Sequence, residues 1–357
     1  MGMRQVRKAT IRDVAAHAGV STATISYFVG GRHDVCSPET GLRIQAAVKE
    51  LGYYPNSIGR SLRQKSTKTL GLCMLALSDP QAMPGSFFLE RLSLGITTYA
   101  DASDYSVLLY PASVRDGTSC DAFLDGRVDG LLFHPHDNIR TQKVAAAGLP
   151  TVLLTRSIAL PDACGAVWAD ESQCMDLALS HLWDLGHRRI AHIAGPTNPG
   201  GVSFNRAADV AVQRLHAYNS WMMERDSFDP VLVGAADGWT GERVPNVMIN
   251  LLNLKYPPTA VVCANDRLAI AAIAAANEAG ISVPRDISVV GVDNSPETRG
   301  RRPALTSVHI PLEEIGREAV STLLRLMHGA PVDECRIKLP VTRLVIRDST
   351  TTPRKEA

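Results

Sequence analysis

The stretch Thr10–Gly52 contains three helix-length segments with their own start and stop signals, and this constrains the fold more than any other feature. In each segment a capping residue is followed by apolar residues at helical spacing. Three short helices of this kind can bury one small shared core. The N-terminal caps are Thr10, with Asp13 as its acidic partner, then Ser21, and Ser37 followed by Pro38, while Gly19 and Gly52 end the first and third segments.

The first two segments are joined through Ala18-Gly19-Val20, which is the spacing of a helix-turn-helix. In such a unit the second helix offers its N-terminal residues to base edges in the major groove of DNA. Apolar spacing turns Ile25, Phe28 and Val29 inward, so Thr22, Ala23, Ser26 and Tyr27 face outward. The turn alone leaves a second interpretation open, in which the three helices form a protein-interaction module.

The distribution of charge favours DNA over a protein partner. Residues 1–68 contain eleven Lys and Arg against four Asp and Glu, a balance of +7, whereas the whole chain carries +1. The remaining residues must therefore sum to −6. Positive charge concentrated at one end of a chain is typical of phosphate binding.

The segments DVAAHAGVSTATIS, SPETGLRIQAAVKELGYYPN and RSLR resemble, in order and spacing, the DNA-binding head of the lac repressor/galactose repressor family. The resemblance implies that the head binds a double-stranded DNA operator. It implies base reading by Thr22, Ala23 and Tyr27, phosphate or backbone contacts by Ser21, Thr24, Ser26 and Asn56, and further DNA contacts by Thr10, Ile58, Gly59 and Leu62.

The segment 56–68 is expected to be a hinge helix and linker. A helix this short is marginal in water, and Gly59 costs it about 1 kcal/mol relative to the alanine usual in the family, so we expect it to order only against a partner. The resemblance implies that it folds in the minor groove with Leu62 as a wedge between base steps. The alternative for Leu62 is a hydrophobic anchor against the rest of the chain.

Tyr27 also departs from the family, which usually carries arginine at this position. A bidentate contact to guanine is therefore lost, and the family's operator sequence cannot be transferred to this chain.

Beyond residue 68, apolar strand-length runs alternate with helical stretches. Examples are the runs at 70–77, 128–133, 260–264 and 287–292. Continuous apolar strands that alternate with helices predict parallel sheets covered on both faces, and two doubly wound lobes account for the two series of runs. Ligands bind such sheets outside the carboxyl ends of the strands.

Several segments of this region resemble the regulatory core of the same family, among them RVDGLLFHP, LGHRRIAHIAGP, AVVCANDRLAIAA and LVIRDST. The fold class implied is an all-α helix-turn-helix head plus an α/β core of two doubly wound lobes of the periplasmic-binding-protein type. We expect a DNA-binding domain at 1–55, the hinge at 56–68 and the core at 69–357. Chain crossings are expected near Asp170, Asn294 and Met327, with lobe one at about 69–169 and 295–326 and lobe two at about 170–294 and 327–349.

The resemblance also implies that a small-molecule effector, a sugar or sugar derivative, binds between the lobes. Polar side chains directly after apolar strands can hydrogen-bond its hydroxyl groups, while aromatic side chains form apolar walls. Thr155 stands where the family often has aspartate, Asp266 is interpreted as a helix N-cap, and Trp168 and Asp293 also have structural interpretations, as core and as a turn cap. The residues expected to contact effector are Phe87, Thr155, Trp168, Arg206, Trp239, Asn265 and Asp293.

Other classes of function have little support in the sequence. The N-terminal residues are polar and basic, no apolar run approaches the ~20 residues of a membrane span, and the expected location is the cytoplasm. The seven cysteines lack CxxC spacing and predict buried thiols rather than a disulfide framework or metal site. No GxSxG or HExxH motif points to catalysis, and no cofactor is expected. A homodimer is the expected assembly, and the alternative function is a solute-binding protein with the same core fold.

Overall fold

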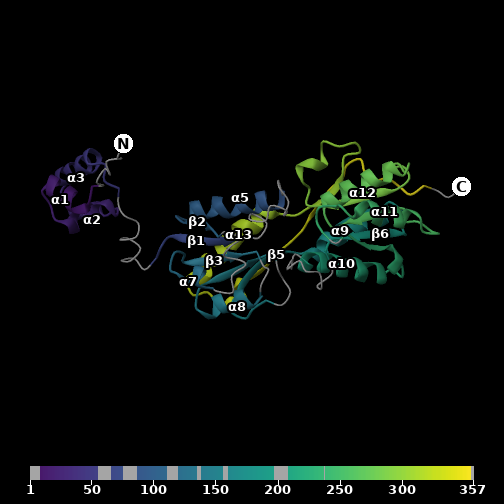
Figure 1. Ribbon diagram of the computed structural model, residues 1–357, viewed down its shortest axis with the longest axis horizontal. Helices are drawn as coiled ribbons and strands as arrows, with labels where there is room; N and C mark the ends of the chain where they lie inside the picture. Colours follow the sequence, from purple (N-terminus) through teal and green to yellow (C-terminus); the bar gives the residue numbers. More distant parts are fainter. Residues whose placement is uncertain are drawn as a thin grey trace, which may run out of the picture. The chain divides into compact units, whose positions relative to one another are not determined.

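The chain divides into two compact units, Met1–Thr67 and Lys68–Ala357, called here the head and the core (Figure 1). The computed structural model describes residues 9–54, 66–74, 87–110, 120–134, 138–155, 160–196, 208–236 and 238–354. Within these ranges, none of the helices combines the length and the apolar character needed to cross a membrane.

The head is a bundle of three α-helices, which confirms the prediction. Thr10 and Asp13 form the expected capping box, because the Thr10 hydroxyl accepts from the Asp13 N–H at 3.3 Å and the Asp13 carboxylate accepts from the Thr10 N–H at 2.8 Å. Gly19 ends the first helix in the left-handed conformation, at φ 67°, which glycine adopts without strain. The elements are α1 (Ile11–Ala18), α2 (Thr22–Val29), η1 (His33–Val35) and α3 (Pro38–Glu50), around a core of Val14, Ala15, Ala18, Ile25, Phe28, Ile44 and Ala47.

Lobe one of the core is a parallel sheet in the order β11-β5-β4-β3-β1-β2. Leu70 of β1 lies opposite Val107 of β2 and Gly130 of β3. Helices α5 and α13 pack on one face, and α7 and α8 pack on the other. The bounds are β1 (Thr69–Cys73), α5 (Phe87–Ala102), β2 (Ser106–Leu109), α7 (Asp121–Leu124), β3 (Gly130–Phe133), α8 (Asn138–Ala146), β4 (Thr151–Leu154), β5 (Gly165–Ala169), α13 (Leu312–Met327), η5 (Val332–Cys335) and β11 (Arg336–Leu339).

Lobe two has the strand order β12-β10-β9-β8-β6-β7, parallel except for the antiparallel edge pair β10–β12. Helices α9 and α10 cover one face, and α11 and α12 cover the other. The bounds are α9 (Glu171–Asp184), β6 (Ile190–Ala194), α10 (Ala208–Met223), η3 (Pro230–Leu232), β7 (Val233–Ala235), α11 (Val244–Leu252), β8 (Ala260–Cys263), α12 (Asp266–Glu278), β9 (Ser288–Val292), η4 (Pro296–Thr298), β10 (Thr306–His309) and β12 (Arg343–Val345).

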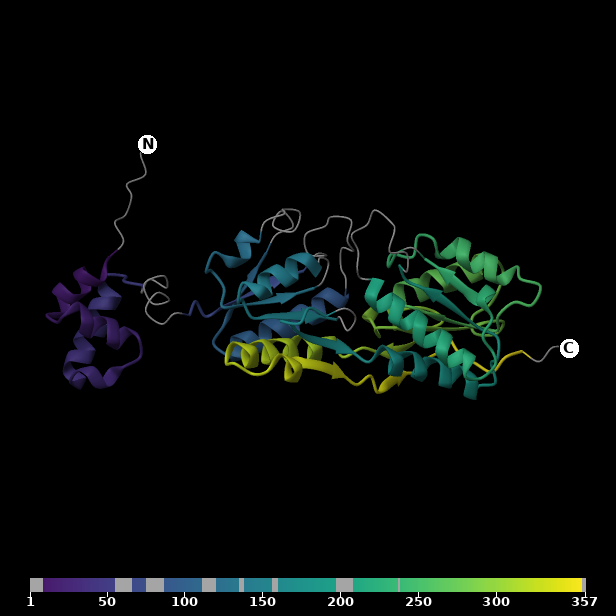
Figure 2. The ribbon, with the colours of Figure 1, turned by 90° about the horizontal axis from the view of Figure 1, so that it is seen from below.

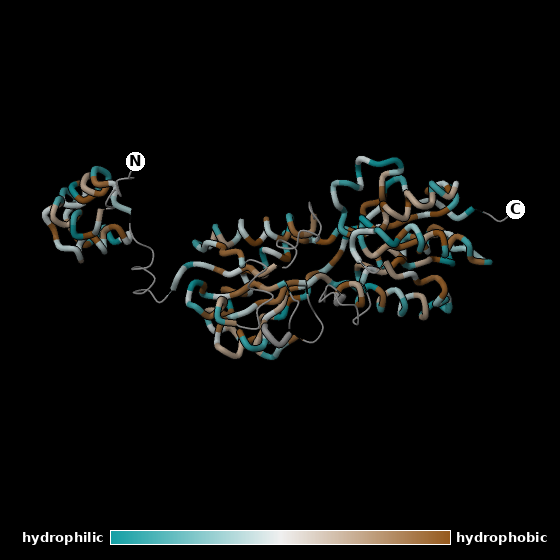
Figure 3. The backbone as a smooth tube through the Cα atoms, in the orientation of Figure 1, coloured by the Kyte–Doolittle hydropathy of each residue, from teal (hydrophilic) through white to brown (hydrophobic). Residues whose placement is uncertain are grey.

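Strand residues alternate between the two covered faces of each sheet. In β8, Val262 belongs to the core cluster under α9 and α10, whereas Val261 and Cys263 belong to the cluster under α11 and α12. Because both faces of each sheet are covered, central strands such as β3 and β8 are apolar throughout, and the sheets are coloured largely as hydrophobic in Figure 3. The predicted α/β architecture is therefore confirmed. Six of the seven cysteines are buried and all are free thiols.

The chain crosses between lobes at Asp170, at Ile310–Pro311 and at 340–342. The first crossing lies where it was predicted, but the predictions near Asn294 and Met327 are wrong. After Asn294 the chain returns to the lobe-two sheet as β10, and after Met327 it adds β11 to lobe one before passing to β12 (Figure 2). Lobe one therefore does not contain 295–310, and lobe two does not begin its last segment at 327.

The two errors have one physical cause. Strands β10 (TSVH) and β11 (RIKL) are short and half polar, so they lack the continuous apolar run that identifies a central strand in sequence. The polar residues Thr306 and Ser307 of β10 are fully buried and are accommodated by hydrogen bonds to Arg347 and Asp266. Strand β11 lies at the edge of its sheet and is only partly buried.

Helices α5 and α13 approach each other closely through two glycines. A Cβ on Gly95 would collide with the backbone of Glu313, and a Cβ on Gly316 would collide with the backbone of Leu92. Backbone atoms cannot rotate away as a flexible side chain can. The contact of α5 and α13, and with it one face of lobe one, depends on these missing side chains.

We predict that Gly95→Ala lowers the free energy of unfolding of the core by about 1–3 kcal/mol, although alanine is the better helix former. All four tryptophans lie in the core, so urea unfolding followed by tryptophan fluorescence reports this unit. Gly300→Ala is the matched control, because a Cβ there meets nothing within 4 Å. Equal stability of the Gly95→Ala variant and the parent chain would contradict the close approach.

Candidate DNA-reading helix and effector-binding residues

The outward face of α2 carries the residues predicted to read bases. Thr22, Ala23 and Tyr27 are exposed, whereas Ile25 and Phe28 are buried on the opposite face. Tyr27 is 52% exposed, and the Arg32 guanidinium lies 5.5 Å from the centre of its ring. The same guanidinium also pairs with the Asp34 carboxylate at 2.9 Å, which offsets its positive charge beside the aromatic ring.

Several predicted phosphate contacts also stabilise helix ends. Ser21 caps α2, because its hydroxyl accepts from the Thr24 N–H at 3.1 Å, and the two hydroxyl groups lie 2.9 Å apart. Thr10 caps α1 in the same way. The caps leave backbone N–H groups and hydroxyls together at one end of each helix, where an anion is favoured. The hinge predictions for Asn56, Ile58, Gly59 and Leu62 lie outside the described residues, as does the effector prediction for Arg206.

In lobe two, polar residues follow β8 directly. Asn265, and not Asp266 as predicted, is the N-cap of α12, since its side-chain oxygen accepts from the Leu268 N–H at 2.9 Å. The buried Asp266 carboxylate instead accepts from the Ser295 N–H at 2.7 Å and from the Ser307 hydroxyl at 2.5 Å. Asp266 thus ties the loop after β9 to strand β10. Burial raises its pKa to about 6, against the lowering effect of these two hydrogen bonds.

A buried ion pair lies at the same edge of the sheet. The Nε of Arg214, from α10, lies 2.6 Å from the Glu171 carboxylate at the start of α9, and its Nη1 donates to the carbonyl of Ala264 at 2.5 Å. Arg214 is only 4% exposed and Glu171 only 7%. Two charges this deep are stable only as a pair with their remaining hydrogen bonds made.

Asp293, directly after β9, belongs to the same charged group. Burial raises the pKa of Asp293 to about 8; Arg214 opposes this shift, and the carboxyl groups of Asp266 and Glu171 add to it. At neutral pH the carboxyl group is then largely protonated, so it can both donate and accept a hydrogen bond. Among the described residues it has no hydrogen-bond partner. The backbone of Asp293 has a φ of 113°, a conformation that residues other than glycine rarely adopt. Strained backbone conformations of this kind are common at functional sites.

The remaining predicted effector residues lie at strand ends or in the core. Thr155 follows β4 at φ 57°, is buried, and donates its hydroxyl to the Leu154 carbonyl at 2.7 Å. The six-membered ring of Trp239 lies against Gly195 after β6, where a Cβ would approach it within 2.9 Å. Trp168 packs partly buried against the lobe-one core on the face of α7 and α8, which agrees with its structural interpretation.

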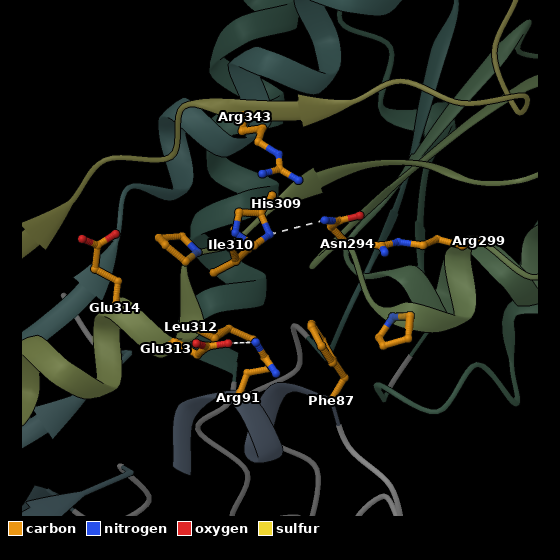
Figure 4. A pocket seen from close by; sticks show the side chains of 12 residues that line it. Phe87, Arg91, Asn294, Arg299, His309, Ile310, Leu312, Glu313, Glu314 and Arg343 are labelled. Carbon is orange, nitrogen blue, oxygen red and sulfur yellow. Dashed lines mark hydrogen bonds and ion pairs between the residues drawn. The ribbon is translucent and has the colours of Figure 1, made fainter. Parts of the chain in front are cut away.

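Phe87 lines a pocket of about 490 Å³ between the lobes, whereas the other predicted effector residues in the described ranges are not on its wall. Figure 4 shows its lining, which comes from α5 and α13 of lobe one, from the loop after β9, and from β10 and β12 of lobe two. Phe87, Arg91, Asn294, Pro296, Arg299, His309, Ile310, Pro311, Leu312, Glu313, Glu314 and Arg343 surround the space.

The Arg214–Glu171 ion pair was not predicted from the sequence. A signal was present, because Ala211, Arg214 and Tyr218 occupy one buried stripe of α10. A cation in an apolar helical stripe requires a buried partner. Within the described ranges, no three His, Cys, Asp or Glu residues are grouped so that they could hold a metal ion.

We predict that Arg214→Leu lowers the free energy of unfolding by about 3–5 kcal/mol, because it leaves the Glu171 carboxylate buried without a partner. The double variant Arg214→Leu, Glu171→Leu removes both charges and should recover most of this loss. Urea unfolding followed by tryptophan fluorescence measures both. If the double variant were no more stable than the single one, the ion pair would not account for the cost.

We predict that Asp293→Asn weakens the pH dependence of core stability between about pH 4 and pH 8. The folded state keeps this proton up to a pKa of about 8, whereas the unfolded chain releases it near the ordinary value of about 4. The parent chain therefore loses stability from this group as pH rises through the window, and asparagine has no proton to release. Urea unfolding at a series of pH values tests this, with the exposed Glu278→Gln on α12 as control. Parallel curves for the parent and Asp293→Asn would refute the raised pKa.

Comparisons with known proteins agree with this geometry. Residues 10–56 match the family model for bacterial regulatory proteins of the lacI family, and residues 179–350 match a periplasmic binding protein-like domain. The HTH-type transcriptional repressor CytR of Escherichia coli (strain K12) is 31% identical over 97% of this chain and 98% of its own length. The repressor PurR of Proteus mirabilis is 33% identical over 88% of this chain and 89% of its own.

Two solved structures show the same arrangement. The lac repressor dimer bound to operator and the anti-inducer ONPF matches with a TM-score of 0.81 at 29% identity, over 97% of this chain and all of that one. The complex of the transcriptional regulator CelR with cellobiose matches with a TM-score of 0.67 at 28% identity, over 96% of this chain and 99% of that one. The chain therefore belongs to the lacI family of bacterial regulatory proteins, DNA-binding repressors that respond to small-molecule effectors.

Proposed function

We propose that this chain represses transcription as a homodimer on a palindromic operator and is released by a sugar or sugar derivative bound between its lobes. The observation that carries the proposal is the exposed face of α2 in the head. The core that follows has two lobes with polar groups at the ends of its strands, as a receptor for a small molecule needs. Two heads related by a two-fold axis read the two halves of a palindrome.

In this proposal, Thr22, Ala23 and Tyr27 read base edges, while Ser21, Thr24 and Ser26 position the helix on phosphates, with Thr10 nearby. The hydroxyl of Tyr27 offers one hydrogen bond in place of the fork of an arginine, so the chain selects a different base pair there. Asn56, Ile58, Gly59 and Leu62 complete the DNA contact through the hinge.

In this proposal Asp293, Asn265 and Thr155 hold the effector at the strand ends, Arg206 also contacts it, and Phe87, Trp168 and Trp239 form apolar walls. The protonated carboxyl of Asp293 and the amide nitrogen of Asn265, neither with a hydrogen-bond partner among the described residues, suit the paired donors and acceptors of sugar hydroxyls. The CelR complex contains cellobiose, which agrees with this ligand class. The regulator acts by binding alone, without catalysis, and in the cytoplasm, where the DNA is.

We predict that Tyr27→Ala weakens binding to the selected operator by about tenfold to a hundredfold, the cost of one lost base contact. The operator is first enriched from a random pool of double-stranded DNA with the full chain. Gel shifts then measure its affinity and that of an unrelated fragment, which Tyr27→Ala should change little because phosphate contacts remain.

The control is Tyr54→Ala, which removes another exposed tyrosine of the head, 87% exposed, outside α2. The operator affinity of Tyr54→Ala should stay within about twofold of the parent chain, because no base contact is assigned to Tyr54 and the contact of Tyr27 is kept. Failure to enrich any sequence would reject the repressor function, whereas equal effects of Tyr27→Ala and Tyr54→Ala would reject the reading role of α2.

A further inference from the structure

The loop that follows α2 carries a charged pair beside the outward face of that helix. The chain turns at Gly31, which has a φ of 94°, and the Arg32 N–H then donates to the Tyr27 carbonyl at 3.0 Å. This turn places the Arg32 guanidinium 5.5 Å from the centre of the Tyr27 ring. The side chains of Arg32 and Asp34 are 62% and 68% exposed. Tyr27, Arg32 and Asp34 therefore form one exposed group that continues the outward face of α2 into the loop.

The same loop is fixed to the core of the head on its other side. The His33 ring packs edge-on against the Phe28 ring, with the ring centres 4.7 Å apart. Val35, at the end of η1, packs against the apolar core of the three helices. Arg32 thus lies between α2 and an anchored turn of 3-10 helix. Contacts on both sides set the position of its backbone, and only its side chain is left to adjust to a partner.

Asp34 orients the Arg32 guanidinium without using all of its donors. The Nη2 of Arg32 donates to one carboxylate oxygen at 2.9 Å, and its Nε donates to the other at 3.5 Å. A guanidinium carries five N–H donors in a fixed fork, so the edge formed by Nη1 and Nη2 still presents two parallel donors. Two parallel donors match the N7 and O6 acceptors that guanine shows in the major groove.

The pairing also decides what this arginine can recognise. A lone arginine is attracted by any phosphate of the DNA backbone. The Asp34 carboxylate offsets the charge of Arg32 and repels phosphate, so the pair gains little from the backbone. Sequence-independent attraction can come instead from other exposed cations of the head, such as Arg12, Arg43 and Lys49. The contribution of the pair then depends on whether a base offers acceptors in the right places.

We propose that Arg32 reads a guanine in each half of the operator, with Asp34 as the positioning residue that orients its guanidinium. This proposal rests on the repressor function proposed above and deepens it, because it identifies a base-reading residue outside α2. The 5.5 Å between the guanidinium and the Tyr27 ring lies between one and two base-pair steps of about 3.4 Å. Arg32 and Tyr27 therefore contact neighbouring base pairs, and the one beside the Tyr27 contact is G·C.

The test is a double-mutant cycle between Arg32 and the base pairs of the operator. The operator is enriched from random double-stranded DNA with the full chain, and each G·C pair is then replaced by A·T, in both halves together. Gel shifts of the parent chain should show one replacement that weakens binding about tenfold to a hundredfold. Arg32→Ala should weaken binding to the intact operator by a similar factor. The same replacement should then cost Arg32→Ala no more than about twofold, because the contact is already absent.

Two further variants separate base reading from attraction by charge. Arg32→Lys keeps the charge but not the fork of donors, so it should lose most of the preference for the G·C pair and bind an unrelated fragment within about twofold of the parent chain. Asp34→Asn removes the carboxylate charge, so it should bind the unrelated fragment about twofold to tenfold more tightly and prefer the G·C pair less. Both side chains are more than half exposed, so the variants should fold, and circular dichroism checks their helices.

The matched control is Arg43→Ala, which removes an exposed arginine of α3 that donates to the Thr40 hydroxyl at 3.3 Å. The cost of replacing the G·C pair should stay within about twofold of that for the parent chain, because no base contact is assigned to Arg43. An equal loss of the preference in Arg43→Ala would overturn the proposal, and so would a full preference in Arg32→Ala or Arg32→Lys. Unchanged binding by Asp34→Asn would overturn the positioning role of Asp34.

Failure of this proposal is distinct from failure of the repressor function. If the parent chain enriches no operator, the repressor function is rejected and the proposal with it. If the parent chain enriches an operator in which no base pair depends on Arg32, the repressor function stands and only the proposal is rejected.

Discussion

The Arg214–Glu171 ion pair is the interaction on which the carboxyl-end edge of the lobe-two sheet depends. Arg214 reaches from α10 to the first residue of α9 and to the carbonyl after β8, so one guanidinium joins two helices and the end of a central strand. Without its charge, three carboxyl groups, those of Glu171, Asp266 and Asp293, would share a buried space with little compensation. Of the two aspartates, Asp293 has the higher pKa, so it is largely protonated and neutral at the end of β9 at neutral pH.

Asp266 extends this constraint to the crossings. Its carboxylate holds both the loop after β9 and strand β10, and β10 leads directly into the second crossing. At the first crossing, Asp170 caps α9 and pairs with Lys338 of β11 at 2.8 Å, and its N–H donates to the Leu339 carbonyl. The first and third crossings are therefore bonded together. Movement of one lobe relative to the other must be accommodated by a few backbone torsions beside buried polar groups.

The sequence predicts the helices of the head well, because their signals are local. Thr10 with Asp13, Ser21, and Ser37 with Pro38 act within one turn of the chain, and the structure contains these caps. The parallel sheets of the core are also predictable, since central strands such as β3 and β8 are apolar throughout. Propensity and pattern agree at these positions.

The rest could not be predicted because it depends on contacts between residues far apart in the chain. The sequence does not show that TSVH returns to lobe two, since that depends on pairing with β9 and on the Asp266–Ser307 hydrogen bond. Asn265 and Asp266 are adjacent polar residues at a helix start, and either can cap; which one does so is decided by Ser295 and Ser307, far along the chain. Arg214 was detectable as a cation in an apolar stripe, but its partner Glu171 was not.

The second crossing lies beside both the proposed effector residues at the end of β9 and the pocket that Phe87 lines. Asp293 and Asn294 are neighbours with positive φ, at 113° and 56°, and only Asn294 lines the pocket. Asp293 is assigned to the effector, and Asn294 is held by Ser307 and Arg347. Both residues are held in sparsely populated backbone conformations by the structure around them. An effector that contacts Asp293 therefore acts on a segment that is fixed through Asn294 to strand β10, and β10 leads into the second crossing.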